Sequence, residues 1–309
     1  MTATPLERLD SRPVLAAVLG ALTIAFTGIL VRLANVEPAT AAVFRCVYAL
    51  PVLWWLARAE RQAFGPREGG QRRLALIAGV FFAADLVSWH YAIQLVGAGL
   101  ATVLGNTQVI FVAIVAWLWF GEKLSARFFA ALALALLGVL LISGVVGSGA
   151  YGLNPALGAA LGLFTGAAYA GFLLFQRLGN RDMRRPAGPL LDATLSAAVA
   201  SALAGLAIGE ISFLPSWPAH GWLVILALSA QVVGYLLISV ALPRLPSALT
   251  SIILLVQPVA AVGLTMLLLH EQPSFIQLTG VALVVGGVAM ATVGRRASSA
   301  PTAVEAGPP

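Results

Sequence analysis

The chain has 309 residues, of which 60% are hydrophobic and only 10% are charged, with a formal net charge of +6. Soluble domains carry about 25% charged residues, so this composition excludes a water-facing globule and indicates a protein with lipid as its solvent. Cys46 is the only cysteine, which excludes disulfides within the chain and thiolate metal clusters.

Apolar runs long enough to cross a bilayer fill the sequence. A spanning helix needs about 20 mainly apolar residues, and helices satisfy their own backbone hydrogen bonds in hydrocarbon. Ten runs are expected to span the membrane, at residues 13–33, 39–57, 73–96, 98–120, 125–144, 153–177, 189–210, 219–241, 246–269 and 274–294. The predicted fold class is an all-α membrane protein with ten transmembrane helices. The first run is expected to be retained as a span, because it is too long for a signal peptide core.

The basic residues predict how these spans are oriented. With the N-terminus in the cytoplasm, 16 of the 18 Lys and Arg residues fall on the cytoplasmic side, and Arg32 and Arg45 lie at the outer ends of the first two spans. This positive-inside bias predicts that both termini are cytoplasmic. It also explains the net charge without nucleic acid, which is not an expected partner. The connections 59–71 and 179–188 are expected to be the longest internal cytoplasmic loops.

An internal repeat relates the two parts of the chain. Leu74–Leu141 lies without a gap on Leu223–Met290 after a shift of 149 positions (223 minus 74), which places Gln108 on Gln257. Each half then holds five spans. Because five is odd, the second half is expected to enter the membrane from the opposite side, as in many secondary transporters.

The repeat divides the chain into domains. Residues 1–149 and 150–296 are expected to be two inverted-topology five-helix repeats, and residues 297–309 a disordered cytoplasmic tail, since they are small, polar and proline-rich. Ser125 and Ser274 are predicted N-caps, the latter in a capping box with Gln277.

Glycines on the fifth and tenth spans provide small faces for close helix packing. Gly138 lies on the fifth span, and Gly280, Gly286 and Gly287 lie on the tenth. These faces serve either the fold or a homodimer, so monomer and homodimer both stay open.

Two short breaks carry a resemblance to a known family. The sequence G-E-K-L-S at 121–125 and H-E-Q-P-S at 270–274 each precede a glycine-bearing final span, and Arg45 lies in the second span. Together with the two five-span halves, these residues resemble the EamA-type transporters of the drug/metabolite transporter superfamily, over about residues 13–294. His270 replaces the glycine that is usual in that family. The run S-W-H-Y at 88–91 is similar, more narrowly, to the bacterial aromatic and neutral amino acid exporters of that branch.

Polar side chains inside the third span are the first candidates for a binding site. A charge at mid-bilayer costs about 2.5–3.5 kcal/mol on insertion scales, so each one needs a reason. Asp85 lies in the middle of the span, with Ser88 and Trp89 on its face. His90 lies about 140° round the helix from Asp85. Each of the two residues has either a packing role or a role in a wet cavity, and the resemblance favours His90 as a cavity residue.

Other spans add amides and tyrosines. Gln108 and Gln257 are repeat mates expected to meet near the pseudo-twofold axis, and Pro258 is expected to free a carbonyl and bend the ninth span. Mid-span tyrosines indicate a bundle interior, since lipid-facing ones usually lie at the interface. The candidate substrate-binding residues are Asp85, Trp89, His90, Asn106, Gln108, Tyr169, Tyr235 and Gln257.

The resemblance implies a secondary transporter that exports neutral and aromatic amino acids across the bacterial inner membrane by alternating access. The sequence has no G-x-x-x-x-G-K-[ST] loop for ATP, and no mid-span pair of cations to hold a phosphate. No catalytic residue, metal or cofactor is expected; the expected partners are amino acids and the lipid bilayer. The alternative is a multidrug exporter of flat organic cations, with Asp85 as counter-charge. Proton coupling stays open.

Overall fold

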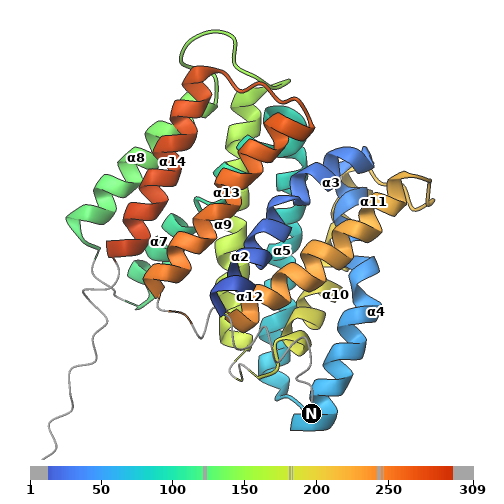
Figure 1. Cartoon of the computed structure of the whole chain (residues 1–309). Coiled ribbons are helices and arrows are strands. Elements are labelled where there is room, and N and C mark those ends of the chain that lie inside the picture. Colours follow the sequence, from blue (N-terminus) through green and yellow to red (C-terminus); the bar gives the residue numbers. More distant parts are fainter. Residues whose placement is uncertain are drawn as a thin grey trace, which may run out of the picture.

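The computed structural model describes residues 13–120, 124–180, 182, 184–241, 245 and 247–294, and every regular element in these residues is a helix (Figure 1). The first expected half contains α2 (Pro13–Ala25), α3 (Thr27–Ala34), α4 (Pro38–Phe64), α5 (Gly69–Val96), α6 (Ala98–Gly105), α7 (Gln108–Phe120) and α8 (Ala126–Ile142). The second contains α9 (Pro155–Gly179), α10 (Ala187–Ile208), α11 (Ala219–Leu226), the π-helix η1 (Ala227–Gly234), α12 (Tyr235–Ala241), α13 (Ser247–Leu268) and α14 (Phe275–Gly294).

Eight helical stretches are long and apolar enough to cross a membrane. Two shorter apolar helices, Ala126–Ile142 and Leu255–Leu268, fall within the expected fifth and ninth spans. The all-helical membrane class is therefore confirmed for the described residues. The count of ten spans and the inverted repeat stay predictions, and Glu122 and the tail 297–309 lie outside the described residues.

The predicted cytoplasmic loop at 59–71 is mostly helical. Helix α4 continues to Phe64 and α5 begins at Gly69, which leaves only residues 65–68 between them. The prediction was wrong because it ended the helices where the apolar residues end, whereas Ala, Arg, Glu and Gln are good helix formers. Helix α4 ends at Gly65, whose φ of 80° is a left-handed conformation that glycine adopts without strain. We call this the lower end of the bundle, as it is drawn in Figure 1.

Three of the expected spans, the first, fourth and eighth, depart from regular α-geometry in their interior. Phe26 separates α2 from α3, Asn106 and Thr107 separate α6 from α7, and η1 lies between α11 and α12. At the second break, the Leu104 carbonyl accepts from the Thr107 backbone nitrogen at 3.1 Å and from the Thr107 hydroxyl at 2.6 Å, so the threonine side chain competes for backbone hydrogen bonding there. Helix α13 is continuous through Pro258, so this proline does not interrupt the helix, and the bend expected there stays a prediction.

The helix contacts fall into pairs that relate the two halves. Helix α5 packs on α9, and the corresponding helices of the predicted repeat, α11–η1–α12 and α2–α3, also pack on each other. Helices α4 and α10 pair directly, as do α8 and α14, the latter two at one side of the bundle (Figure 1).

The glycine faces of α8 and α14 pack against each other within the chain. A Cβ atom on Gly138 would lie 2.6 Å from the Gly280 carbonyl oxygen, and a Cβ on Gly280 equally close to the Gly138 carbonyl oxygen. Any larger residue would separate the two helices. Of the two roles that the sequence left open, these glycines serve the fold.

Candidate functional site

Arg45 lies inside the bundle, and its predicted place at the outer end of a span was wrong. It is the eighth residue of α4, about 10 Å along the axis from Pro38, and only 3% exposed. Its Nε donates to Oε1 of Gln231 at 3.1 Å, and its guanidinium lies 6.0 Å from the centre of the Phe82 ring. The prediction placed Arg45 at the water-facing end of its span because its partners inside the bundle are far away in sequence and could not be recognised.

Gln231 fixes the position of Arg45. It lies in η1 and is fully buried, and its Nε2 donates to the Thr194 hydroxyl of α10 at 3.2 Å. The amide thus joins α4, η1 and α10 through one side chain. Its place in a π-helix is in keeping with the frequent occurrence of π-bulges at functional sites.

Asp85 is the opposite charge beside Arg45. It is residue 17 of the 28-residue helix α5 and is 7% exposed. The two side chains interact electrostatically, but no nitrogen–oxygen distance between them is 4.0 Å or less. In the described part of the chain, no hydrogen bond reaches the Asp85 carboxylate, and the terminal nitrogens of Arg45 make none. Both charges therefore keep free hydrogen-bonding capacity.

The backbone around Asp85 is held by hydroxyl groups. The Ser88 hydroxyl lies 2.8 Å from that of Thr165 on α9, and both hydroxyls approach the Asp85 carbonyl, at 3.1 and 3.5 Å. These contacts fix α5 against α9 at the height of the carboxylate.

Four aromatic rings form a wall next to these charges. Phe82 and Phe172 stack with centroids 4.6 Å apart, and Tyr169 lies 5.3 Å from Phe172. Tyr235 meets Phe82 edge-on at 5.9 Å. Tyr169 and Tyr235 lie near each other and near Arg45 and Asp85. We call Arg45, Asp85, Tyr169 and Tyr235 the interior charge cluster.

Trp89 and His90 lie further along α5 and are nearly or fully buried. The His90 Nδ1 bonds the Pro38 carbonyl at 3.0 Å, so the ring joins α5 to the start of α4. Its Nε2 is buried without a hydrogen-bond partner among the described residues, and its ring lies 5.4 Å from that of Trp89.

The predicted amides are not joined to one another. Asn106 donates to the Thr102 carbonyl of the preceding helix α6 at 2.8 Å. The Gln108 Oε1 is buried without a partner in the described residues, whereas Gln257 is partly exposed. No hydrogen bond links Gln108 to Gln257 in the part of the chain that the structure describes. The structure thus gathers three predicted residues, Asp85, Tyr169 and Tyr235, around an arginine that the prediction placed elsewhere.

Glu271 ties the upper end of the bundle together. Its carboxylate, 2% exposed, accepts from the backbone nitrogens of Ala98 at 2.7 Å and Gly99 at 3.2 Å. A carboxylate is stabilised at this place by the free N–H groups of the α6 N-terminus. The neighbouring His270 has φ 54°, a left-handed conformation that explains why glycine suits this position.

Both predicted helix caps are confirmed, and the one at the start of α14 lies next to this joint. The Ser274 hydroxyl accepts from the Gln277 nitrogen at 3.2 Å, and Gln277 Oε1 accepts from the Ser274 nitrogen at 3.0 Å. Ser125 caps α8 in the same way, through the Phe128 nitrogen at 3.3 Å.

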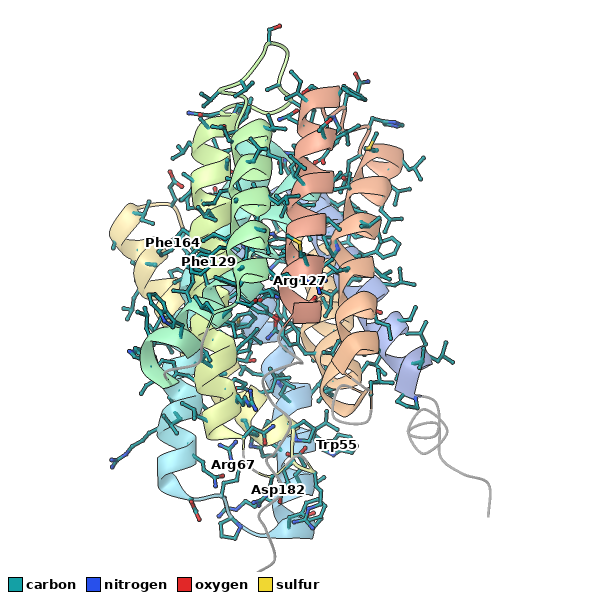
Figure 2. All side chains as sticks on the ribbon, turned by 90° about the vertical axis from the view of Figure 1, so that its left-hand side faces the viewer. Trp55, Arg67, Arg127, Phe129, Phe164 and Asp182 are labelled. Atoms are coloured by element: carbon teal, nitrogen blue, oxygen red, sulfur yellow. The ribbon has the colours of Figure 1, made fainter. Side chains whose placement is uncertain are left out.

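The lower end of the bundle is open and basic. A cavity of about 680 Å³ lies between the end of α4 and the starts of α5 and α10. Figure 2 shows Trp55, Arg67 and Asp182 at this end. Asp192 forms ion pairs with Arg67 and, at 3.4 Å, with Arg72. This cavity is separate from the interior charge cluster, which is enclosed in this conformation.

Comparisons with known proteins identify the family. The model of the EamA-like transporter family matches residues 11–144 and 156–293. A solved structure titled "Crystal structure of protein" is 19% identical, with a TM-score of 0.61, and the match covers 94% of this chain and 99% of that chain. At that identity the likeness shows the fold alone. The comparison with curated proteins gives no match. Two matches of the family model, which together cover most of the chain, show that this multi-pass membrane protein belongs to the EamA-like transporter family.

Proposed function

We propose that this transporter exports neutral and aromatic amino acids across the bacterial inner membrane by alternating access, with the interior charge cluster as its substrate site. The observation that carries the proposal is the pair Arg45 and Asp85. Arg45 and the carboxyl group of Asp85 are both buried, and they do not pair directly.

The chemistry of an amino acid fits these two groups. A buried charge without a close partner is costly, so an arrangement that separates two of them needs a reason. An α-amino acid carries a carboxylate, which a guanidinium binds with parallel hydrogen bonds. Its ammonium group is complementary to the Asp85 carboxylate. The substrate thus supplies both counter-charges at once.

The aromatic wall supplies the remaining selectivity. Phe82 and Phe172 present apolar ring surface beside the charges, and offset or edge-on ring contacts favour an aromatic side chain by about 0.5–1.5 kcal/mol. The other candidates stay as proposed contacts in further conformations: Trp89, His90, Asn106, Gln108 and Gln257.

Alternating access requires two units that move against each other. The proposed units are residues 1–149 and 150–296, in opposite orientations. Support comes from the two separate family matches and from the helix contacts that recur when the halves are exchanged. The cytoplasmic position of both termini is supported by the basic residues at the lower end (Figure 2).

The second candidate function is efflux of flat organic cations, which the free carboxylate of Asp85 favours. Arg45 weighs against it, because a cation bound at Asp85 would also meet the guanidinium. Uptake of labelled amino acids into liposomes carrying the purified protein tests the choice. Export of amino acids predicts saturable uptake that unlabelled amino acids inhibit. Inhibition by flat cations and not by amino acids would overturn it.

A further inference from the structure

Arginine is the most frequent residue in the lining of the cavity at the lower end. Its charged lining residues are Arg58, Glu60, Arg61, Arg67, Arg72, Arg185 and Asp192. Five guanidinium groups against two carboxylates give the lining a surplus of three positive charges, of which that of Arg185 is paired with Asp182 at 3.2 Å. A cavity with this surplus attracts anions.

Both carboxylates of the lining are already engaged by the protein. Asp192 pairs with Arg67 and Arg72, and Glu60 accepts from the backbone nitrogens of Ala187 and Gly188, each at 2.8 Å. They are therefore poorly placed to neutralise the remaining arginines.

Three arginines of the lining keep donor capacity. No ion pair involves Arg58 or Arg61 among the described residues. In addition, Nη1 of Arg67 is buried without a hydrogen-bond partner in that part of the chain. Guanidinium donors of this kind match the oxygen atoms of a phosphate group.

Apolar surface leads away from the cavity along α4. Val47, Pro51, Trp54 and Arg58 are all exposed, and their spacing puts them on one face of the helix. Trp54 lines the cavity and is 55% exposed, with the Arg58 guanidinium 5.6 Å from its ring centre. Tryptophan is typical of the membrane interface.

A second apolar stripe runs beside the first. Helix α10 packs on α4 and exposes Leu195, Val199 and Leu203 at a spacing of four residues. This stripe starts at Leu195, about one turn beyond Leu191 and Asp192, which line the cavity. Arginines at the membrane interface are thus continuous with apolar surface that runs to bilayer depth.

We propose that this cavity binds the phosphate headgroup of an anionic phospholipid, whose acyl chains lie along the stripes of α4 and α10. A free phosphate or a soluble anion would use the arginines but not the stripes. The cytoplasmic leaflet, where the lower end is proposed to lie, carries anionic lipids that attract basic residues. The inference is independent of the transported substrate.

Native mass spectrometry of the full-length protein, released from vesicles of equal phosphatidylglycerol and phosphatidylcholine content, tests the proposal. We expect the wild-type protein to retain phosphatidylglycerol in preference to phosphatidylcholine. We expect the ratio of retained phosphatidylglycerol to phosphatidylcholine to be about tenfold lower in R58Q/R61Q than in the wild type. These two arginines are chosen because they leave the Asp192 ion pairs intact.

The matched control is R73Q/R177Q, which removes two exposed arginines near the same end that do not line the cavity. Retention of the preference in this control supports a site, whereas an equal loss in both double variants would reduce the effect to general surface attraction and overturn the proposal. Equal retention of the two lipids by the wild type would overturn it without any variant. Displacement of the lipid by inorganic phosphate in millimolar excess would overturn the assignment to a phospholipid.

Discussion

Two groupings of arginine and aspartate differ in how their charges are satisfied. At the lower end, Asp192 is in direct ion pairs with Arg67 and Arg72. In the interior, Arg45 and Asp85 interact without a direct pair, and Arg45 is steadied by the neutral amide of Gln231. Both aspartates are similarly buried, at 6% and 7% exposure. The two aspartates are therefore almost equally buried and differ in direct pairing, which is present at Asp192 and absent at Asp85.

The difference follows from the cost of removing charges from water. A buried ion pair recovers this cost only with good geometry and satisfied hydrogen bonds. Asp192 meets that condition within the protein. Under the proposed function, the interior grouping meets it when a bound substrate supplies the missing partners. The predictions below test this contrast, beginning with the largest expected effect.

Replacement of Arg45 by glutamine removes the proposed carboxylate anchor. Two charge-assisted hydrogen bonds, each worth about 1.5–3 kcal/mol, predict a loss of amino acid uptake of about 100-fold or more. The control is Arg32→Gln, which removes an exposed arginine from the same half. Equal uptake by R45Q and R32Q in correctly folded protein would show that Arg45 does not hold the substrate.

Replacement of Asp85 by asparagine keeps the shape of the side chain and removes its charge. We expect amino acid uptake to fall by about tenfold or more, because the substrate ammonium loses its counter-charge. Uptake of the corresponding deaminated acid, which has no ammonium group, should fall much less. If D85N lost the uptake of flat cations but kept normal amino acid uptake, the alternative function would be favoured instead.

The variant Asp192→Asn tests the ion pairs of Asp192 with Arg67 and Arg72. The change leaves Arg67 without its carboxylate, so we expect a loss of about 3 kcal/mol in the free energy of unfolding. Arg72 adds little, since its side chain is 64% exposed. Thermal unfolding in detergent measures the loss, and uptake per folded molecule should stay near that of the wild type. A D192N protein that is as stable as the wild type but has a large transport defect would show that Asp192 serves transport and not stability.

The smallest effect on stability is expected from the ion pair of Asp182 and Arg184 at the lower end. Hydrogen bonds from Arg184 lower the pKa of Asp182 from 3.8 to about 2. A lowered pKa means that the pair stabilises the fold above the unfolded pKa and loses this contribution as the pH falls from about 4 to about 2. Unfolding temperatures of wild type and Asp182→Asn should therefore differ slightly at pH 6 and converge near pH 2. A difference that stays constant over this range would rule out the ion pair as its cause.

The sequence was sufficient for features that depend on local pattern. The apolar runs predicted helix positions within a few residues over most of the chain, and the serine at the start of α14 predicted its cap. Asp85 stood out because a charge in a long apolar run is costly wherever its partner lies.

Features that depend on distant partners were missed. Arg45 was placed at a helix end because Gln231, its hydrogen-bond partner, is 186 residues away. The helix break at Asn106 was missed in favour of Pro258, although asparagine and threonine compete for backbone hydrogen bonds much as proline removes one. The sequence held a signal for each feature. Arg45 is a charged residue in the predicted second span, and the break at Asn106 lies in a cluster of polar residues in the predicted fourth span.

Competition between an aromatic amino acid and its amide, measured in wild type and R45Q, tests the central claim most directly. The amide keeps the ammonium group and the ring but lacks the carboxylate. The account predicts that the wild type prefers the amino acid by about tenfold or more, and that R45Q removes this preference. The same preference in both proteins would contradict a carboxylate site at Arg45.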